Sequence, residues 1–123
     1  MWTLSKQFHF EAAHILPYHE GKCARLHGHS WGLTVECAHT RLHTTGPQRG
    51  MVIDYGSISE AVRPLLEAKL DHWYLNETTG LESPTSEALA LWVYTQLKPA
   101  LPLLRAITIT ETCTSACRYT EKA

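Results

Sequence analysis

The sequence lacks any long apolar run. Its N-terminal segment alternates polar and apolar residues and has no continuous apolar core, which argues against a signal peptide. No other stretch approaches the roughly 20 apolar residues that a transmembrane helix requires. We therefore expect a cytoplasmic protein with no membrane-spanning segment.

The sequence also lacks an excess of charge of either sign. The net charge is −1, so there is no basic face of the kind that binds nucleic acid. Cysteine is sparse as well, because the four residues Cys23, Cys37, Cys113 and Cys117 do not resemble a dense secreted disulfide framework. In a reducing compartment they are free thiols, metal ligands or nucleophiles.

The 123 residues fit one compact domain, which we expect to span residues 1–123. Apolar and polar residues alternate from Trp2 to His14 and again from Trp31 to Cys37, which predicts two strands with one buried face each. A third strand is predicted around Ile107–Thr110. A short fourth strand is predicted at Arg118–Thr120.

Two helices are predicted between the second and third strands. The first begins at Ser57, where Ser57 and Glu60 have the spacing of a capping box, and ends near Leu70. Pro64 should kink this helix or divide it into two pieces. The second helix is predicted within "SPTSEALALWVYTQLKP", where Pro84 suits the first turn and Pro99 ends the helix.

This order of elements predicts an α+β fold, with a four-stranded antiparallel sheet and two helices on one face. The edges of such a sheet remain open. Because open edges are usually paired or covered, we expect the chain to form oligomers through them.

The segment "KCARLHGHSW" contains two histidines separated by one glycine. In a strand, His27 and His29 point to the same side, where two imidazoles can bind one zinc ion. His14 joins them if the first two strands pair, which gives three nitrogen ligands and an open fourth position. Alternatively, Cys23 is the fourth ligand, and the zinc site is then closed and structural.

Two further positions carry groups that can do chemistry. Asp71 directly precedes His72, and a turn at the helix end would let the carboxylate orient the imidazole for proton transfer. Glu111 follows Ile107 and Ile109 on the same strand face. A carboxylate in that position can accept two parallel N–H groups from a ligand, or it can simply reach water.

Six motifs together resemble the 6-pyruvoyl-tetrahydropterin synthase superfamily: "FEAAH", "CARLHGH", "GMVIDY", "LDHWYLNE", "PTSE" and "ETCT". They occur in the order found in that superfamily and cover nearly the whole chain. Three residues separate Cys23 from the HGH motif, as in the bacterial branch that serves queuosine biosynthesis, whereas the animal enzymes resemble it with a longer insert.

The resemblance implies a T-fold, in which subunits join their sheets into a barrel as trimers or dimers of trimers. It also implies a role for each matching residue. His14, His27 and His29 would bind zinc, Cys23 would be a catalytic acid or base, and Asp71 with His72 would transfer protons. Glu111 would bind the pterin, whose pocket would be lined by Thr85, Ser86, Glu87 and Thr112. Sites of this superfamily form between subunits, so Cys23 would face Glu111 of another chain.

The implied reaction converts 7,8-dihydroneopterin triphosphate into 6-carboxy-5,6,7,8-tetrahydropterin, acetaldehyde and triphosphate, which makes the chain a carbon–carbon lyase. Lys22 and Arg25 flank Cys23 and are candidates to meet the triphosphate. Two alternatives stay open. One is elimination of triphosphate with the side chain kept, as in the pyruvoyl enzymes. The other is a pterin-binding or metal-binding oligomer without enzymatic activity.

Overall fold

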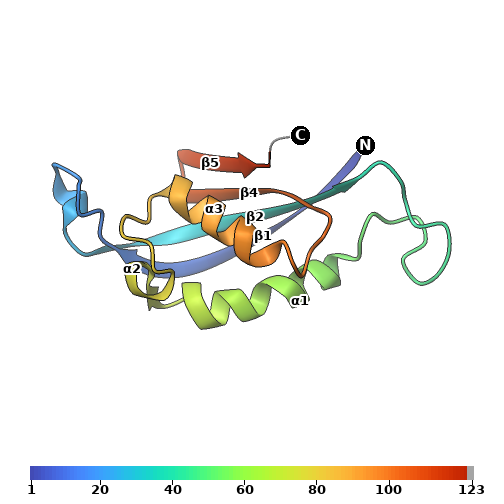
Figure 1. Cartoon of the computed structure of the whole chain (residues 1–123), viewed down its shortest axis with the longest axis horizontal. Coiled ribbons are helices and arrows are strands. Elements are labelled where there is room, and N and C mark those ends of the chain that lie inside the picture. The colour runs from blue at the N-terminus through green and yellow to red at the C-terminus, as the bar shows by residue number, and fades with distance from the viewer. Residues whose placement is uncertain (122–123) are drawn as a thin grey trace.

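The computed structural model describes residues 1–121 and forms one mixed sheet with helices on one face (Figure 1). Strands β1 (Trp2–His14) and β2 (His27–His39) pair antiparallel along their whole length. Strand β4 (Leu104–Thr112) pairs with β2, and β5 (Ser115–Thr120) pairs with β4, both antiparallel. The four predicted strands and their antiparallel pairing are confirmed.

The prediction of a sheet with only four strands is wrong, because a two-residue strand, β3 (Trp73–Tyr74), adds a fifth. It lies parallel to β1 and pairs only with Ala12 and Ala13, so the order is β3-β1-β2-β4-β5. A strand of two residues is too short to show an alternation of polar and apolar residues in the sequence, so it was not predicted. The outer edge of β1 before Ala12 has no strand partner within residues 1–121.

Both long helices cover the same face of the sheet. Helix α1 (Tyr55–Leu65) contributes Ile58 and Val62 to the core, and helix α3 (Ser86–Leu97) contributes Leu89, Val93 and Leu97. These side chains pack against the inward residues of the strands, which include Phe8, Phe10, Trp31, Leu33, Val35, Ile107 and Ile109. The alternation seen in the sequence thus separates the core face from the polar face.

The expected capping box of the first helix is wrong. The helix begins one turn earlier, where the Asp54 side chain accepts a hydrogen bond from the Gly56 backbone N–H at 2.7 Å. Ser57 therefore lies inside the first turn. An aspartate is as good an N-cap as a serine, and the earlier start brings Tyr55 into the helix.

Pro64 divides the helix as predicted. It cannot donate a backbone hydrogen bond, and the α-helix ends at Leu65. A π-helical turn, η2 (Leu66–Leu70), follows and ends where the sequence predicts. The backbone then extends at Asp71, so the Asp71–His72 pair lies directly at a helix end.

Pro84 does not lie in the first turn of α3. Thr85 is the N-cap, and its hydroxyl accepts a hydrogen bond from the Ala88 N–H at 3.1 Å. Pro84 precedes the cap and is buried. Its backbone carbonyl is consequently free to contact β1.

Two short helices complete the described chain: η1 (Lys22–Ala24), a 3-10 turn, and α2 (Leu75–Thr78), a single α-helical turn. The loop between β1 and β2 and the loop after β2 project at opposite ends of the sheet (Figure 1). Within residues 1–121 no helix is both long enough and apolar enough to cross a membrane.

Candidate active site

The three predicted metal ligands come together at one end of the β1–β2 pair. His14 is opposite His27 in the strand register, and His29 is opposite Ala12. The ring centroids of His14 lie 4.5 Å from those of His27 and 5.2 Å from those of His29. One ligand atom from each histidine lies within 4.8 Å of the others, which is close enough for a single ion to reach all three.

The hydrogen bonds of the imidazoles identify the atoms that would bind the ion. The Nδ1 atom of His14 lies 2.9 Å from the Pro84 carbonyl oxygen, and Nδ1 of His27 lies 2.7 Å from the Arg25 carbonyl oxygen. A carbonyl oxygen only accepts hydrogen bonds, so these Nδ1 atoms carry the proton. The lone pair is then on Nε2, as in metal-binding histidines that donate their other N–H.

The Nε2 atoms of His14, His27 and His29 are buried and have no hydrogen-bond partner in the described structure. Buried polar atoms are nearly always satisfied, so three unpartnered Nε2 atoms in one cluster point to a missing ligand. A metal ion satisfies all three at once. The residues present therefore fit a metal bound by three nitrogen atoms, and such a donor set suits zinc.

Burial also favours the neutral form of His14 and His29. It lowers the pKa of His14 and of His29, because the charged imidazolium loses its hydration. The charge of a neighbouring histidine lowers both pKa values further. The hydrogen bond between His14 and the Pro84 carbonyl partly offsets the lowering of the His14 pKa. The negative charge of Glu111 partly offsets it for both His14 and His29. Neutral imidazoles are the form that binds a metal.

The carboxylate of Glu111 lies beside the histidine cluster. Its Oε1 atom is 3.4 Å from Nε2 of His14 and 3.7 Å from Nε2 of His29. The carboxylate is about one-third exposed, so one side faces the histidines and the other faces solvent. It is thus placed either to bind the ion or to bind a ligand beside it.

Cys23 lies next to the histidines, on the 3-10 turn η1. It lines a hollow of about 400 Å³ together with His27 and His29, and Lys22 and Arg25 are at the same hollow. Cys23 does not belong to the group of ligand atoms within 4.8 Å of one another. Within one chain, these positions favour a metal site with three histidine ligands and an open fourth position, with the Cys23 thiol nearby.

A sequence model of the family described as 6-pyruvoyl tetrahydropterin synthase matches residues 3–122. The chain belongs to this family. Its resemblance in sequence extends to the bacterial branch: a 6-carboxy-5,6,7,8-tetrahydropterin synthase of a Synechocystis species is 53% identical over 97% of this chain and 93% of the relative. The protein of the same name from Haemophilus influenzae is 32% identical over 98% of this chain and all of the relative.

The fold is that of the same family. The structure of Caenorhabditis elegans 6-pyruvoyl tetrahydropterin synthase superposes with a TM-score of 0.83, at 24% identity, over 98% of this chain and 96% of that one. The Plasmodium vivax enzyme superposes with a TM-score of 0.71 at 15% identity, over the whole of both chains. The T-fold expected for a single chain is confirmed, and the barrel formed by several subunits stays a prediction.

The Asp71–His72 pair forms as the sequence predicts. Oδ1 of Asp71 lies 3.0 Å from Nδ1 of His72, and the backbone N–H of Glu11 also donates to Oδ1 of Asp71 at 2.9 Å. The hydrogen bond from the Glu11 backbone is the main cause that lowers the pKa of Asp71, and the contact with His72 lowers it further. His72 is largely exposed, so the family's predicted proton-transfer residue can meet a ligand.

The predicted pterin-pocket residues lie at the ends of α3 and β4. Thr85 uses its hydroxyl to cap α3, and the Ser86 hydroxyl donates to the Glu87 carboxylate at 3.0 Å. Thr112 is the last residue of β4, and its hydroxyl contacts that of Thr114 in the turn to β5. Among residues 1–121, no hydrogen bond or ion pair joins these four side chains to the three histidines.

Sequence reasoning missed the groups that orient the histidines. Two are backbone carbonyls, of Pro84 and Arg25, and carry no side-chain signal. The third is Trp31, predicted only as a core residue. Its ring lies 4.9 Å from that of His14, and its Nε1 donates to the Ala12 carbonyl. The Trp31 ring, held by this hydrogen bond, therefore packs against His14.

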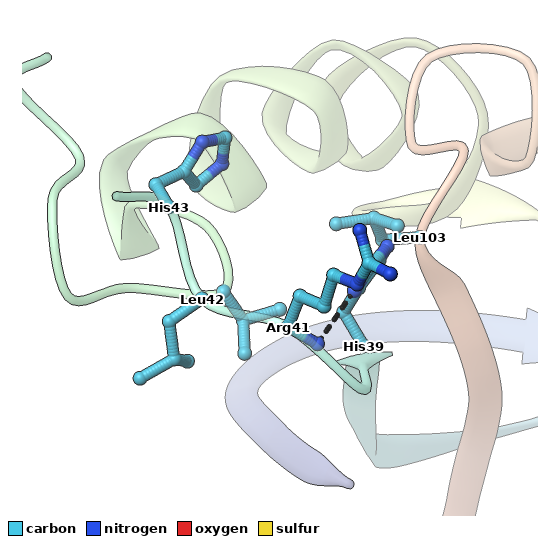
Figure 2. Close-up of a pocket in the computed structure, with 6 residues that line it drawn as sticks. His39, Arg41, Leu42, His43 and Leu103 are labelled. Atoms are coloured by element: carbon cyan, nitrogen blue, oxygen red, sulfur yellow. Dashed lines mark hydrogen bonds between the residues drawn. The ribbon is translucent and has the colours of Figure 1, made fainter. Parts of the chain in front are cut away.

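A second hollow, of about 300 Å³, lies at the opposite end of the sheet (Figure 2). His39 and Arg41 lie side by side there, and the Arg41 backbone N–H donates to Nδ1 of His39 at 2.8 Å, while His43 lies apart (Figure 2). These histidines form no metal-binding group among the described residues.

Proposed function

We propose that this chain converts 7,8-dihydroneopterin triphosphate and water into 6-carboxy-5,6,7,8-tetrahydropterin, acetaldehyde and triphosphate. It would act in the cytoplasm as a zinc-dependent carbon–carbon lyase of queuosine biosynthesis, with the T-fold domain of residues 1–123 as its catalytic unit. The observation that carries the proposal is the convergence of three orphaned Nε2 atoms beside Cys23, in a chain 53% identical to a relative of that name.

In this proposal His14, His27 and His29 hold the zinc ion. When bound there, zinc supplies a Lewis acid for the oxygens of the substrate side chain. The hollow of about 400 Å³ beside these residues is large enough for that side chain. Lys22 and Arg25 line the same hollow and would neutralise the triphosphate.

Cys23 and His72 would move the protons. Cys23 is the base or acid at the side-chain carbon next to the pterin ring. His72, oriented by Asp71 at 3.0 Å, would serve the opposite proton step. Each such group contributes about 10²–10⁴-fold to the rate of an enzyme.

Glu111 would accept hydrogen bonds from the 2-amino and N3 groups of the pterin, in a pocket completed by Thr85, Ser86, Glu87 and Thr112. Two parallel N–H···O⁻ bonds give both affinity and orientation. Within one chain Glu111 already lies at His14. Its pairing with Cys23 of another chain thus stays a prediction about the oligomer.

The test is incubation of zinc-loaded protein with 7,8-dihydroneopterin triphosphate, with wild type beside Cys23→Ala. We expect acetaldehyde and the carboxypterin from wild type, and neither from a variant that retains its zinc. Loss of triphosphate without acetaldehyde would identify the pyruvoyl-type reaction instead.

The closed-site alternative makes a different prediction for the same variant. If Cys23 were the fourth ligand, Cys23→Ala would lose zinc, and a zinc–sulfur contact of about 2.3 Å would be measurable by X-ray absorption. The exclusion of Cys23 from the group of converging ligand atoms supports the open site.

A further inference from the structure

Asn76 joins two segments that meet at His14. It lies on the single turn α2, half-buried against the end of β1. Its Oδ1 atom accepts a hydrogen bond from the Ile15 N–H at 2.9 Å. Its Nδ2 atom donates to the Ile15 carbonyl at 2.8 Å and to the Glu82 carbonyl at 3.1 Å.

The three hydrogen bonds of Asn76 reach the two segments that the His14–Pro84 hydrogen bond joins. Ile15 directly follows His14, which donates through Nδ1, and Glu82 comes two residues before Pro84, whose carbonyl accepts at 2.9 Å. The amide of Asn76 therefore fixes the donor segment and the acceptor segment relative to each other. Tyr18 adds a second tie between the same two loops through its hydrogen bond to Glu82.

An amide side chain suits this position because it offers one acceptor and two donor hydrogens on adjacent atoms. The acceptor and one donor match the N–H and C=O of a single residue, Ile15, in the manner of a paired strand. The second donor reaches Glu82. A carboxylate would lose both donors and place its charge against two carbonyl oxygens.

We propose that Asn76 is a positioning residue of the metal site. It holds the Pro84 carbonyl on Nδ1 of His14, so that the His14 proton stays on Nδ1 and the Nε2 lone pair faces the ion. This inference rests on the proposed metal-binding role of His14. Residues that orient a metal-binding histidine typically change metal affinity by about 10–100-fold when replaced.

The experiment compares Asn76→Ala and Asn76→Asp with Thr78→Val. Thr78 lies on the same turn, is also half-buried, and donates to the Lys69 carbonyl at 2.6 Å, away from His14. Two quantities are measured: the His14 tautomer in metal-free protein at pH 8, by long-range ¹⁵N–¹H NMR, and zinc affinity, by competition with a chelator.

We expect both Asn76 variants to shift His14 away from the Nδ1–H tautomer and to bind zinc about 10–100-fold more weakly, whereas Thr78→Val changes neither. The aspartate variant keeps the bond from Ile15 and tests the donors alone should the alanine variant fail to fold. A folded Asn76 variant with the wild-type tautomer and zinc affinity would overturn the proposal.

The two readouts separate this inference from the proposed function. The tautomer is measured without metal or pterin, so a shift in Asn76→Ala supports the positioning role even in a protein that shows no lyase activity. A wild-type protein that binds no zinc would instead contradict the proposed function, while the tautomer would still decide the role of Asn76.

Discussion

His72 has a left-handed backbone, with a φ of 67°, at the junction between the π-helical turn and β3. This conformation is uncommon for residues other than glycine, and it costs energy that the surrounding contacts must supply. It allows neighbouring side chains, which point apart in a strand, to meet. The Asp71–His72 contact therefore depends on the helix end that precedes it.

Asparagine at position 72 would keep this backbone and remove the imidazole, because asparagine tolerates positive φ better than most residues. For His72→Asn we expect kcat to fall about 10²–10⁴-fold, as for loss of a general acid or base, with little change in the free energy of unfolding. Steady-state assay and urea denaturation measure the two. Unchanged kcat would remove His72 from the proposed proton transfer.

Cys37 is a buried thiol at the far end of β2, and burial raises its pKa to about 11. At pH 8 it is therefore both inaccessible and protonated, and only the thiolate reacts. We expect iodoacetamide to label exposed Cys113 in the native protein and to leave Cys37 unlabelled until denaturant is added. Peptide mass spectrometry reads both sites in one sample, and native labelling of Cys37 would contradict the buried assignment.

The same shift gives a stability prediction in alkaline solution. The pKa of Cys37 in the folded protein lies above the ordinary cysteine value of 9.0, so folding favours the neutral thiol. Its contribution is present below pH 9 and is lost as the pH rises toward 11. Cys37→Ala should flatten this part of the stability curve, as measured by urea denaturation between pH 8 and pH 11.

Between β2 and β4, the side chain of Thr110 occupies the space beside Gly32. A Cβ atom on Gly32 would lie 2.1 Å from Oγ1 of Thr110, its cross-strand partner, whereas a Cβ on Gly28 would meet only the Ala12 carbonyl at 3.5 Å. We expect Gly32→Ala to cost about 1–3 kcal/mol of unfolding free energy, the usual cost of overpacking, and Gly28→Ala to cost much less.

The close approach also predicts a rescue. Removing the Thr110 hydroxyl with Thr110→Ala should restore most of the stability lost in Gly32→Ala, because the two groups compete for one space. Urea denaturation of the two single variants and the double variant forms the cycle. Additive losses would show that the destabilisation comes from elsewhere.

The long elements were predictable because their period is strong. Phe8, Phe10, Leu33 and Val35 alternate with polar residues, and no other element fits that pattern. The starts of the helices were less predictable. Ser57 has a suitable spacing to Glu60, but Asp54 caps the helix earlier, and local sequence gives both residues similar preference for that position.

At the scale of the molecule, the sheet of residues 1–121 has two edges without a full strand partner, β5 on one side and most of β1 on the other. Long unpaired edges favour pairing with another chain. We expect sedimentation at micromolar concentration to give a trimer or a dimer of trimers, as the superfamily resemblance implies. A monomer alone would contradict this, and the proposed Cys23–Glu111 pairing between chains with it.

The sequence predicted which histidine side chains form the candidate site. His14 was expected to join His27 and His29 if the first two strands paired, and β1 pairs with β2. The proximity of Glu111 to the same histidines was not predicted, since it depends on the register between β2 and β4. A one-residue slip would have turned Glu111 to the other face.

The orientation of His14 and His27 depends on two main-chain carbonyls, and every amino acid carries a carbonyl. The proposed metal site is therefore encoded partly by the path of the backbone. A scan of single side-chain replacements would not test these two carbonyls. Inserting or deleting one residue in either loop would move the acceptor, and so disturb metal binding without altering a single ligand.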